Sequence, residues 1–261
     1  MIVDAHCHAG TGDGLTGPWD TSAPLGAYLR RARAAGIGRT VAFAAFSSDY
    51  TSANAEVAGI CREHAPRLIG FAFVHPKRDA GQIGAMVEEA VRAYGFRGIK
   101  VHGHDAQVTR EVFDAARRFG IPILYDVAGK TEILDLIVPE YPDVDVIVPH
   151  LGSFADDWRA HQRLLDQMVR LPSLYADTAG VRRFDYVVQA IQRVGARRVI
   201  YGSDGPWLHP GLELHKIRLL GLAPEDEREV TGGNIMRLLR RTRVPARRFG
   251  WVRSARQVQP R

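Results

Sequence analysis

The stretch that decides the fold is MIVDAHCH, residues 1–8, in which a short apolar run leads directly into two histidines. Successive side chains of a β-strand point to opposite faces, so a strand here would place Asp4, His6 and His8 on one face and Cys7 on the other. Two imidazoles that converge on one point are a metal-ligand arrangement. The alternative is a pair of unrelated surface histidines, and the rest of the sequence must decide between them.

Working outward from this strand, short apolar runs alternate with longer amphipathic ones along the whole chain. The apolar runs predict strands at 1–6, 40–46, 67–74, 96–101, 121–127, 144–148, 173–177 and 197–202. Apolar residues at helical spacing predict helices at 24–35, 52–64, 80–94, 108–119, 131–139, 156–170, 184–194 and 211–220, with a ninth helical region at 223–240. Glycines suited to left-handed helix C-caps follow four of these helices, at Gly36, Gly95, Gly120 and Gly195.

Eight strands, each followed by a helix, predict a single α/β domain built as a parallel (β/α)8 TIM-like barrel. The strands are nearly continuous in apolar residues, as expected when both faces of a sheet are covered. The alternative is an open doubly wound sheet, but no glycine-rich phosphate loop follows the first strand. We therefore expect a barrel domain over 1–240, including an extra C-terminal helix, and an arginine-rich tail over 241–261.

The composition excludes several classes of protein. No apolar run reaches the roughly 18 residues that a membrane span needs, and the chain enters its first strand without a signal peptide. Two cysteines, Cys7 and Cys61, do not form a disulfide framework. We therefore expect a cytoplasmic protein with no membrane partner.

The positive charge of the chain is concentrated at its end. The formal net charge is +6, but residues 237–261 contain nine arginines and no acidic residue, so that 1–236 carries a net charge of −3. Such tails are usually solvated, and nucleic acid is not the expected partner. Phe249 and Trp251 favour instead an arm that packs across a neighbouring subunit of a homodimer. The alternative is that they fold back on their own barrel.

Polar residues stand at the ends of the predicted strands, which is where a barrel of this kind holds its active site. They are His6 and His8, Ser47 to Asp49, His75, Lys100 and His102, Asp126, His150, Asp177 and Asp204. Five of the ten histidines in the chain are among them. This coincidence across separate strands favours an active site. Lys100 either lies along the barrel as an ordinary lysine or is carbamylated to give a carboxylate ligand.

Five motifs carry a resemblance to a known family: DAHCH, GIKVHGH, VPHLGSF, YGSDGPW and TGGNIMRLL, in that order along the chain. Together they resemble the amidohydrolase superfamily, most of all the branch of metal-dependent hydrolases that includes proteins of the aminocarboxymuconate-semialdehyde decarboxylase type. The resemblance covers about residues 1–240 and implies a distorted eight-stranded barrel. It implies that His6 and His8 are metal ligands, that Asp204 is the acid after strand 8, and that His150 is either a ligand or a base.

The sequence departs from this family at the end of strand 5, where a further histidine ligand is common and this chain has Asp126. Aspartate can bind zinc or manganese. Three outcomes stay open: a site with harder ligands, a two-metal site that uses Lys100, and a loss of metal affinity.

The sequence leads us to expect a metal-dependent hydrolase that attacks a small-molecule amide, ester or lactone with metal-activated water. Zinc is the expected metal and manganese the alternative, held by His6, His8 and Asp204 with His150 or Asp126. Asp204 would act as general base, while His150 would orient the water or stabilise developing charge. An anionic group of the substrate would contact Lys100, His102, Arg182 and Arg183. The alternative for the two arginines is the exposed start of a helix.

Two other functions stay open. One is a metal-dependent, non-oxidative decarboxylase of a small carboxylic acid, in which the metal orients the substrate and an acid protonates carbon. The other is a degenerate barrel that binds a ligand or partner without chemistry, and the absent strand-5 histidine is its support.

Overall fold

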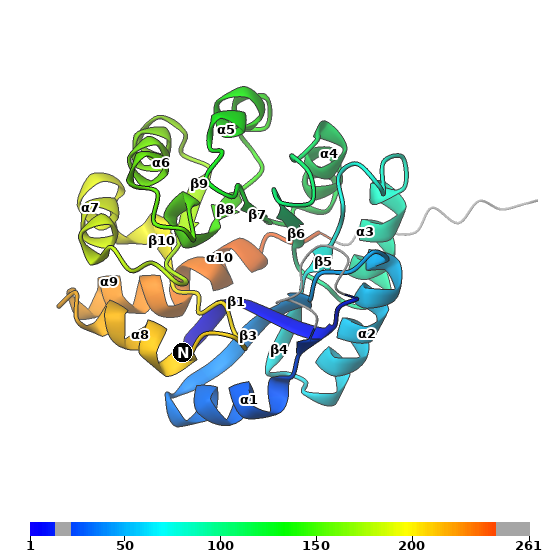
Figure 1. Ribbon diagram of the computed structural model, residues 1–261, viewed down its shortest axis with the longest axis horizontal. Coiled ribbons are helices and arrows are strands. Elements are labelled where there is room, and N and C mark those ends of the chain that lie inside the picture. Colours follow the sequence, from blue (N-terminus) through cyan, green and yellow to red (C-terminus); the bar gives the residue numbers. More distant parts are fainter. Residues whose placement is uncertain (14–21, 244–261) are drawn as a thin grey trace, which may run out of the picture.

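A ring of parallel strands forms the centre of the computed structural model, which describes residues 1–13 and 22–243 (Figure 1). The strands are β1 (Ile2–Thr11), β2 (Ser22–Ala23), β3 (Ile37–Ala44), β4 (Leu68–Gly70), β5 (Ala72–Phe73), β6 (Ile99–His102), β7 (Ile123–Asp126), β8 (Val146–Val148), β9 (Leu174–Asp177) and β10 (Val199–Ile200). All pairings between neighbours are parallel except that of the short β2 with the end of β1. The predicted α/β barrel is confirmed.

Helices surround the ring and cover the outer faces of the strands (Figure 1). They are α1 (Leu25–Ala34), α2 (Tyr50–Glu63), α3 (Ile83–Arg92), α4 (Arg110–Phe119), α5 (Glu132–Ile137), α6 (Trp158–Arg170), α7 (Phe184–Val194), α8 (Pro210–Arg218), α9 (Pro224–Arg228) and α10 (Asn234–Leu239). Short helical turns occupy η1 (Val138–Glu140), η2 (Pro149–Gly152), η3 (Ala196–Arg198) and η4 (Glu229–Gly233). No helix in the described ranges 1–13 and 22–243 is long and apolar enough to cross a membrane.

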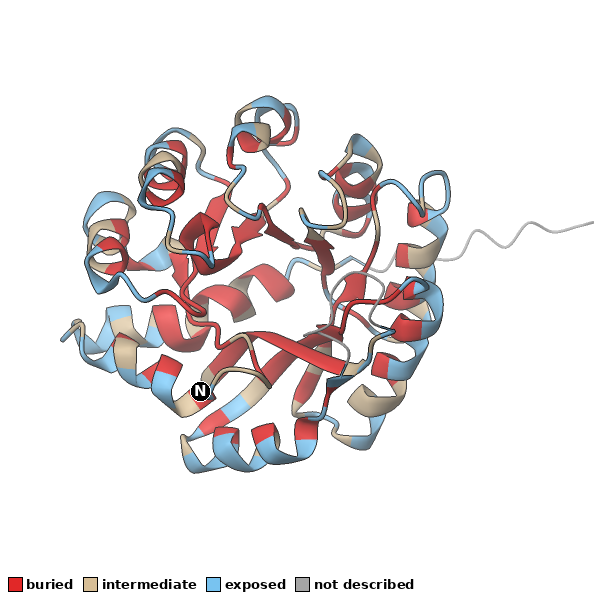
Figure 2. Ribbon diagram, in the orientation of Figure 1, coloured by how far each residue is buried: buried red, intermediate tan, exposed pale blue. Residues whose placement is uncertain are grey.

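Helix α4 shows how the sequence produces these elements. Val112, Phe113, Ala116 and Phe119 recur at helical spacing and are all buried, whereas the arginines between them face water. Gly120 ends the helix at φ +60, in the left-handed region where a residue without Cβ meets no steric penalty. Figure 2 shows the same division around the ring, with buried strands inside and exposed outer helix faces.

The ring is distorted at two places. The single strand predicted at 67–74 is divided at Phe71 into β4, which pairs with β3, and β5, which pairs with β6. The other place lies between the first and last strands, where β10 is short. There the Ala5 amide donates to the Tyr201 carbonyl at 3.1 Å, and the His8 amide donates to the Gly205 carbonyl at 2.6 Å. These bonds bring Asp204 beside the two histidines of β1.

The C-terminal helix lies under the barrel, at the N-terminal end of its strands. The Asn234 side chain donates to the carbonyl oxygens of Ala196 and Val199 at 2.8 and 2.7 Å, which fastens α10 to the start of β10. The proposed tail arm falls outside the described residues from position 244 onward, with Phe249 and Trp251, and so stays a prediction. The two-part division of the chain at 240 is likewise a prediction.

Candidate metal centre

Most of the polar strand ends meet in one cavity of about 670 Å³ at the C-terminal end of the barrel, but Ser47 to Asp49, His75 and Asp177 do not line it. All predicted site residues line it except Arg182 and Arg183; those that do are His6, His8, Lys100, His102, Asp126, His150 and Asp204. They come from β1, β6, β7 and the segments that follow β8 and β10. Parallel strands therefore bring together side chains that lie up to about 200 positions apart in the sequence.

A register shift in β1 decides which of its side chains enter the cavity. Asp4 pairs with Thr40 and Cys7 with Ala42, so β1 uses one residue more than β3 over this stretch. His6 and His8 both line the cavity. Asp4 instead accepts hydrogen bonds from the Tyr28 hydroxyl of α1 at 2.7 Å and from Ser203. The expectation that Asp4 shares a face with the two histidines is therefore wrong, because the extra residue reverses the alternation.

Asp204 lies between the rings of His6 and His8. Its Oδ1 is 3.3 Å from His6 Nε2 and 3.8 Å from His8 Nε2. Ligand atoms of these three residues all lie within 4.8 Å of one another, which makes them a group that could hold a metal ion. We call them the ligand triad. Three protein ligands with one open position is the usual composition of a catalytic zinc site.

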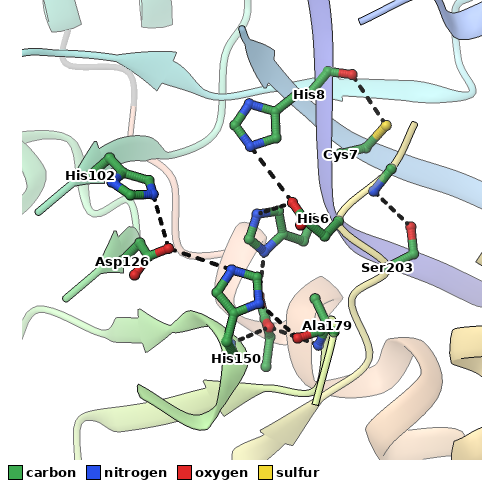
Figure 3. A network of polar contacts seen from close by, with 12 residues as sticks. His6, Cys7, His8, His102, Asp126, His150, Ala179 and Ser203 are labelled. Carbon is green, nitrogen blue, oxygen red and sulfur yellow. Dashed lines mark hydrogen bonds and ion pairs between the residues drawn. The ribbon is translucent and has the colours of Figure 1, made fainter. Parts of the chain in front are cut away.

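Hydrogen bonds fix how the two imidazoles face Asp204. His6 Nδ1 lies 2.8 Å from Asp177 Oδ2, and His8 Nδ1 lies 2.9 Å from the Ala44 carbonyl oxygen. Since carbonyl and carboxylate oxygens only accept, each Nδ1 carries the proton, and a neutral ring then directs the lone pair of Nε2 at Asp204. Figure 3 shows these two rings side by side.

Electrostatics favours a cation within this triad. Burial lowers the pKa of His6 below its ordinary value despite nearby Asp177, and burial lowers the pKa of His8 much further. Both rings are therefore neutral at physiological pH, so a carboxylate oxygen faces two nitrogen lone pairs. Such acceptors repel one another unless a positive charge lies between them, and a divalent ion supplies it. The donor set thus fits zinc or manganese.

A second histidine–aspartate cluster lies in the same cavity, with Asp126 between His102 and His150 (Figure 3). Asp126 Oδ2 is 3.1 Å from His102 Nε2 and 3.4 Å from His150 Nε2, and Oδ1 accepts from the Ala128 amide at 2.7 Å. The His104 amide donates to His102 Nδ1 at 3.0 Å, so His102 carries its proton on Nε2 and donates to Asp126. Here the carboxylate faces donors.

The pKa values in this second cluster differ from those in the triad. Burial alone would lower the pKa of His150, but the hydrogen bond and charge of Asp126 outweigh it and raise this pKa to about 9. Burial would raise the pKa of Asp126, but His102 and His150 hold it well below its ordinary value. The Nδ1 of His150 lies 2.7 Å from the Ala179 carbonyl oxygen. Both nitrogens of His150 therefore carry protons.

His150 stands on a strained turn. It has φ +57, and Leu151 after it has φ +48, which are uncommon values for residues with a side chain. The Leu151 carbonyl oxygen lies 2.9 Å from Nδ1 of the fully buried His161 on α6, and the His150 amide donates to Asp177 Oδ1 at 3.0 Å. Strain of this kind persists only where surrounding bonds hold it. The sequence patterns missed this supporting role of His161, whereas backbone hydrogen bonds were one expectation for Asp177.

Lys100 on β6 is fully buried at the base of the cavity. Its Nζ has no hydrogen-bond partner in the described part of the chain and lies 4.8 Å from the centre of the Phe43 ring. Burial lowers the pKa of this amine, an effect that the charges of Asp126 and Asp204 oppose. An unpartnered buried amine is costly unless a ligand completes it.

Arg182 and Arg183 lie outside the cavity. Arg182 pairs with Asp156 at 2.6 Å with its side chain 72% exposed, and Arg183 pairs with Asp185 at 2.9 Å on the surface at the start of α7. The structure thus does not bring them to the substrate, and the alternative of an exposed helix start describes them. The sequence alone could not exclude these arginines as substrate contacts. Their loop follows β9, and the last residue of β9, Asp177, does contact His6 of the site.

Aromatic side chains form the walls of the cavity. Ring centres lie 4.5 Å apart for Trp207 and His8, 4.8 Å for Phe46 and His102, and 5.0 Å for Phe154 and His150. Trp207 and Phe154 stand at the ends of the motifs YGSDGPW and VPHLGSF, but the sequence alone gave them no predicted role. The available signal was their position, three residues after Asp204 for Trp207 and four residues after His150 for Phe154.

Comparison with known proteins shows the family to which the chain belongs. The family model described as Amidohydrolase matches residues 3–241, and the chain belongs to this family. No curated protein matches the sequence.

Solved structures show the same fold at low sequence identity. An amidohydrolase from Burkholderia multivorans with bound zinc has 15% identity and a TM-score of 0.75, over 92% of this chain and 99% of that one. The 5-carboxyvanillate decarboxylase of Sphingomonas paucimobilis has 13% identity and a TM-score of 0.72, over 92% and 98%. A dihydroxybenzoic acid decarboxylase from a Polaromonas species, with bound manganese and the inhibitor 2-nitroresorcinol, has 15% identity and a TM-score of 0.69, over 92% and 96%.

These findings confirm the family and the barrel that the motifs predicted. They also agree with the predicted class, an enzyme of the amidohydrolase type that depends on a divalent metal. The particular reaction, the substrate and the role of each site residue are matters for proposal.

Proposed function

We propose that the protein is a metal-dependent, non-oxidative decarboxylase of a small aromatic carboxylic acid. This was the alternative predicted from the sequence, and it takes precedence over hydrolysis for one observation: among the described residues, the buried amine of Lys100 has no hydrogen-bond partner, and it lies among aromatic walls beside the ligand triad. The two solved decarboxylases of like fold support the same choice.

Lys100 is the proposed contact for the carboxylate of the substrate. A carboxylate placed beside Nζ would satisfy a buried donor that no residue of 1–13 or 22–243 satisfies, and it would favour the charged amine against the effect of burial. His102 lies two residues further along β6 and faces the same cavity. We therefore keep the prediction of an anionic substrate. Its negative group would contact Lys100 rather than the surface residues Arg182 and Arg183.

The aromatic walls are the proposed contacts for a planar ring. Phe46, Phe154 and Trp207 present apolar faces to a cavity of about 670 Å³, which lies in the usual range for a small-molecule site. A flat substrate can stack between such faces while its acidic group reaches the base of the barrel.

His6, His8 and Asp204 would hold the metal, which supplies a Lewis acid that binds oxygen atoms of the substrate when present. Loss of carbon dioxide leaves an electron pair on the ring carbon, and a proton must replace the carboxyl group there. His150 is the proposed proton donor, because Asp126 and the Ala179 carbonyl hold protons on both its nitrogens. Asp126 and His102 position that ring.

The experiment supplies manganese- or zinc-loaded protein with hydroxylated benzoates, such as 2,6-dihydroxybenzoate and 5-carboxyvanillate, and measures the carbon dioxide released. A panel of amides, esters and lactones tests hydrolysis in parallel. Lys100→Met is the matched variant, because it keeps the length of the side chain but removes the amine. Release of carbon dioxide that Lys100→Met abolishes supports the proposal. Hydrolysis of the amides, esters or lactones without any release of carbon dioxide would contradict the proposal and favour a hydrolase.

Two further predictions from the sequence are retained as part of this proposal: a homodimer, and a cytoplasmic location.

A further inference from the structure

A second cavity of about 490 Å³ lies at the opposite end of the barrel from the metal centre. It lies near the starts of β3 and β4, before the start of β6, and beside the last turns of α2, α3 and α10. We call it the basal pocket. Parallel strands begin at this end, so the basal pocket and the catalytic cavity are separated by the length of the barrel.

Four arginines surround the basal pocket: Arg39, Arg62, Arg97 and Arg240. Many arginines elsewhere have a carboxylate partner, such as Arg110 with Glu140 at 2.6 Å and Arg117 with Asp143 at 2.6 Å. Between residues 22 and 243 the four basal arginines have no carboxylate within salt-bridge distance. Four like charges around one hollow repel one another, and an anion would relieve this repulsion.

The remaining lining supplies no negative charge. In the described part of the chain it contains no aspartate or glutamate, and burial raises the pKa of Cys61 to about 11, so that its thiol stays neutral. Leu68, Ile69, Met236 and Leu239 provide an apolar floor beneath the arginines. The pocket is therefore amphipathic, with cationic groups at the rim and hydrocarbon below.

Helix ends do not account for this arrangement. Arg62 lies in the last turn of α2 and Arg240 directly follows α10, where a basic side chain complements the helix dipole. Arg39, however, lies on β3, and Arg97 lies in the loop before β6. Helix ends place two of the guanidinium groups at this pocket, and a strand and a loop place the other two there.

We infer that the basal pocket is a second ligand site, which binds a small phosphate ester carrying an apolar or aromatic group. A guanidinium fork matches the oxygens of a phosphate in bidentate geometry, and four forks suit a doubly charged group better than a single carboxylate. The apolar floor would take the organic part of the ligand, and the volume suits a molecule of about nucleotide size. This site is independent of the proposed decarboxylation.

Adenosine monophosphate is the probe, titrated calorimetrically into the full-length, metal-loaded protein at low salt, with inorganic phosphate in a parallel titration. The test variant is Arg62→Gln with Arg97→Gln, which removes two charges from the rim and keeps side chains of polar character. The matched control is Arg30→Gln with Arg33→Gln on α1, two exposed arginines that do not line the pocket. The inference predicts one site per chain, tighter for the nucleotide than for phosphate, weakened about 10-fold or more in the test variant and unchanged in the control.

Three results would overturn it. The first is an absence of nucleotide binding, and the second is equal binding in the test variant and the control. The third comes from a 12-residue oligouridylate: binding far tighter than that of the mononucleotide, with steep salt dependence and loss in the test variant, would make this face a nucleic-acid surface instead.

Discussion

Asp204 and Asp126 lie in one cavity, each between two histidines. The histidine nitrogens that face Asp204 present lone pairs, whereas those that face Asp126 present protons. Around Asp204, hydrogen bonds hold the protons of His6 and His8 on the far side of each ring, so that lone pairs face the carboxylate. Around Asp126, the His104 amide holds the proton of His102 on the near side, and protonated His150 adds a second donor. The first arrangement suits a cation between the carboxylate and the two lone pairs, whereas in the second the carboxylate already accepts from its neighbours.

This difference teaches that the residue types alone do not define a metal site. Both clusters contain two histidines and one aspartate, which are residue types that bind metals, but in the described part of the chain only the triad forms a group that could hold an ion. At His6, His8 and His102 the partner of Nδ1 determines whether Nε2 is a donor or a lone pair. At His150 the neighbouring Asp126 decides, because it raises the pKa of the ring so that both nitrogens carry protons. We therefore expect the metal at Asp204 and a positioning role for Asp126.

The largest effect is expected from His6→Ala. Removal of one of three ligands from the triad should abolish metal retention, since the Nε2 lone pair cannot be replaced from the wall of the cavity. Metal content of the purified variant, measured by mass spectrometry of the dissolved ion, checks this. Unchanged metal content in a folded variant would remove His6 from the site.

Asp204→Asn should fold normally and be nearly inactive, with turnover lower by a factor on the order of 10³. The amide has almost the same shape, but it lacks the negative charge that the triad supplies to a cation. Turnover is compared with thermal unfolding of the same preparation, so that misfolding is recognised. Near-normal turnover would show that the carboxylate is dispensable.

Asp126→Asn sharpens the comparison, because it makes the same chemical change in the other cluster. We expect full metal content and turnover reduced by about 10- to 100-fold, as is typical for groups that orient others. A nitrogen-detected magnetic resonance spectrum of the histidines should show an altered protonation pattern at His150. Loss of the metal in this variant would show that Asp126 is a metal ligand, which would contradict the distinction between the two clusters.

The smallest effect is expected from Arg182→Ala and Arg183→Ala. Both arginine side chains are exposed in their ion pairs with Asp156 and Asp185, so water screens these pairs and their loss should change the free energy of unfolding little. KM for an anionic substrate should stay within about 2-fold of the parent value. A rise of KM by an order of magnitude would mean that these arginines do contact the substrate.

The barrel could be predicted because an apolar strand followed by an amphipathic helix repeats eight times, with glycines after four of the helices, and each repeat supports the same architecture. The division of one strand at Phe71 and the register shift after Asp4 could not, because both depend on pairing with neighbours distant in sequence. The site residues at strand ends were found for the same topological reason as the barrel.

Partners across the site were beyond the sequence. Nothing near residue 6 indicates that Asp177 holds its ring, and nothing near residue 126 indicates that His104 fixes His102. The departure at Asp126 was visible in the sequence, but its consequence depends on hydrogen bonds between β6, β7 and the turn after β8. The basal pocket was equally hidden, since its arginines are scattered from 39 to 240.

The most direct test of the account is a crystal structure of the manganese- or zinc-loaded protein, with the ion located by its anomalous scattering. The account predicts an ion within about 2.0–2.2 Å of His6 Nε2, His8 Nε2 and an oxygen of Asp204, with Asp126 still between His102 and His150. An ion bonded directly to Asp126 with the His102 contact broken, or an ion that leaves either β1 histidine unbound, would contradict it.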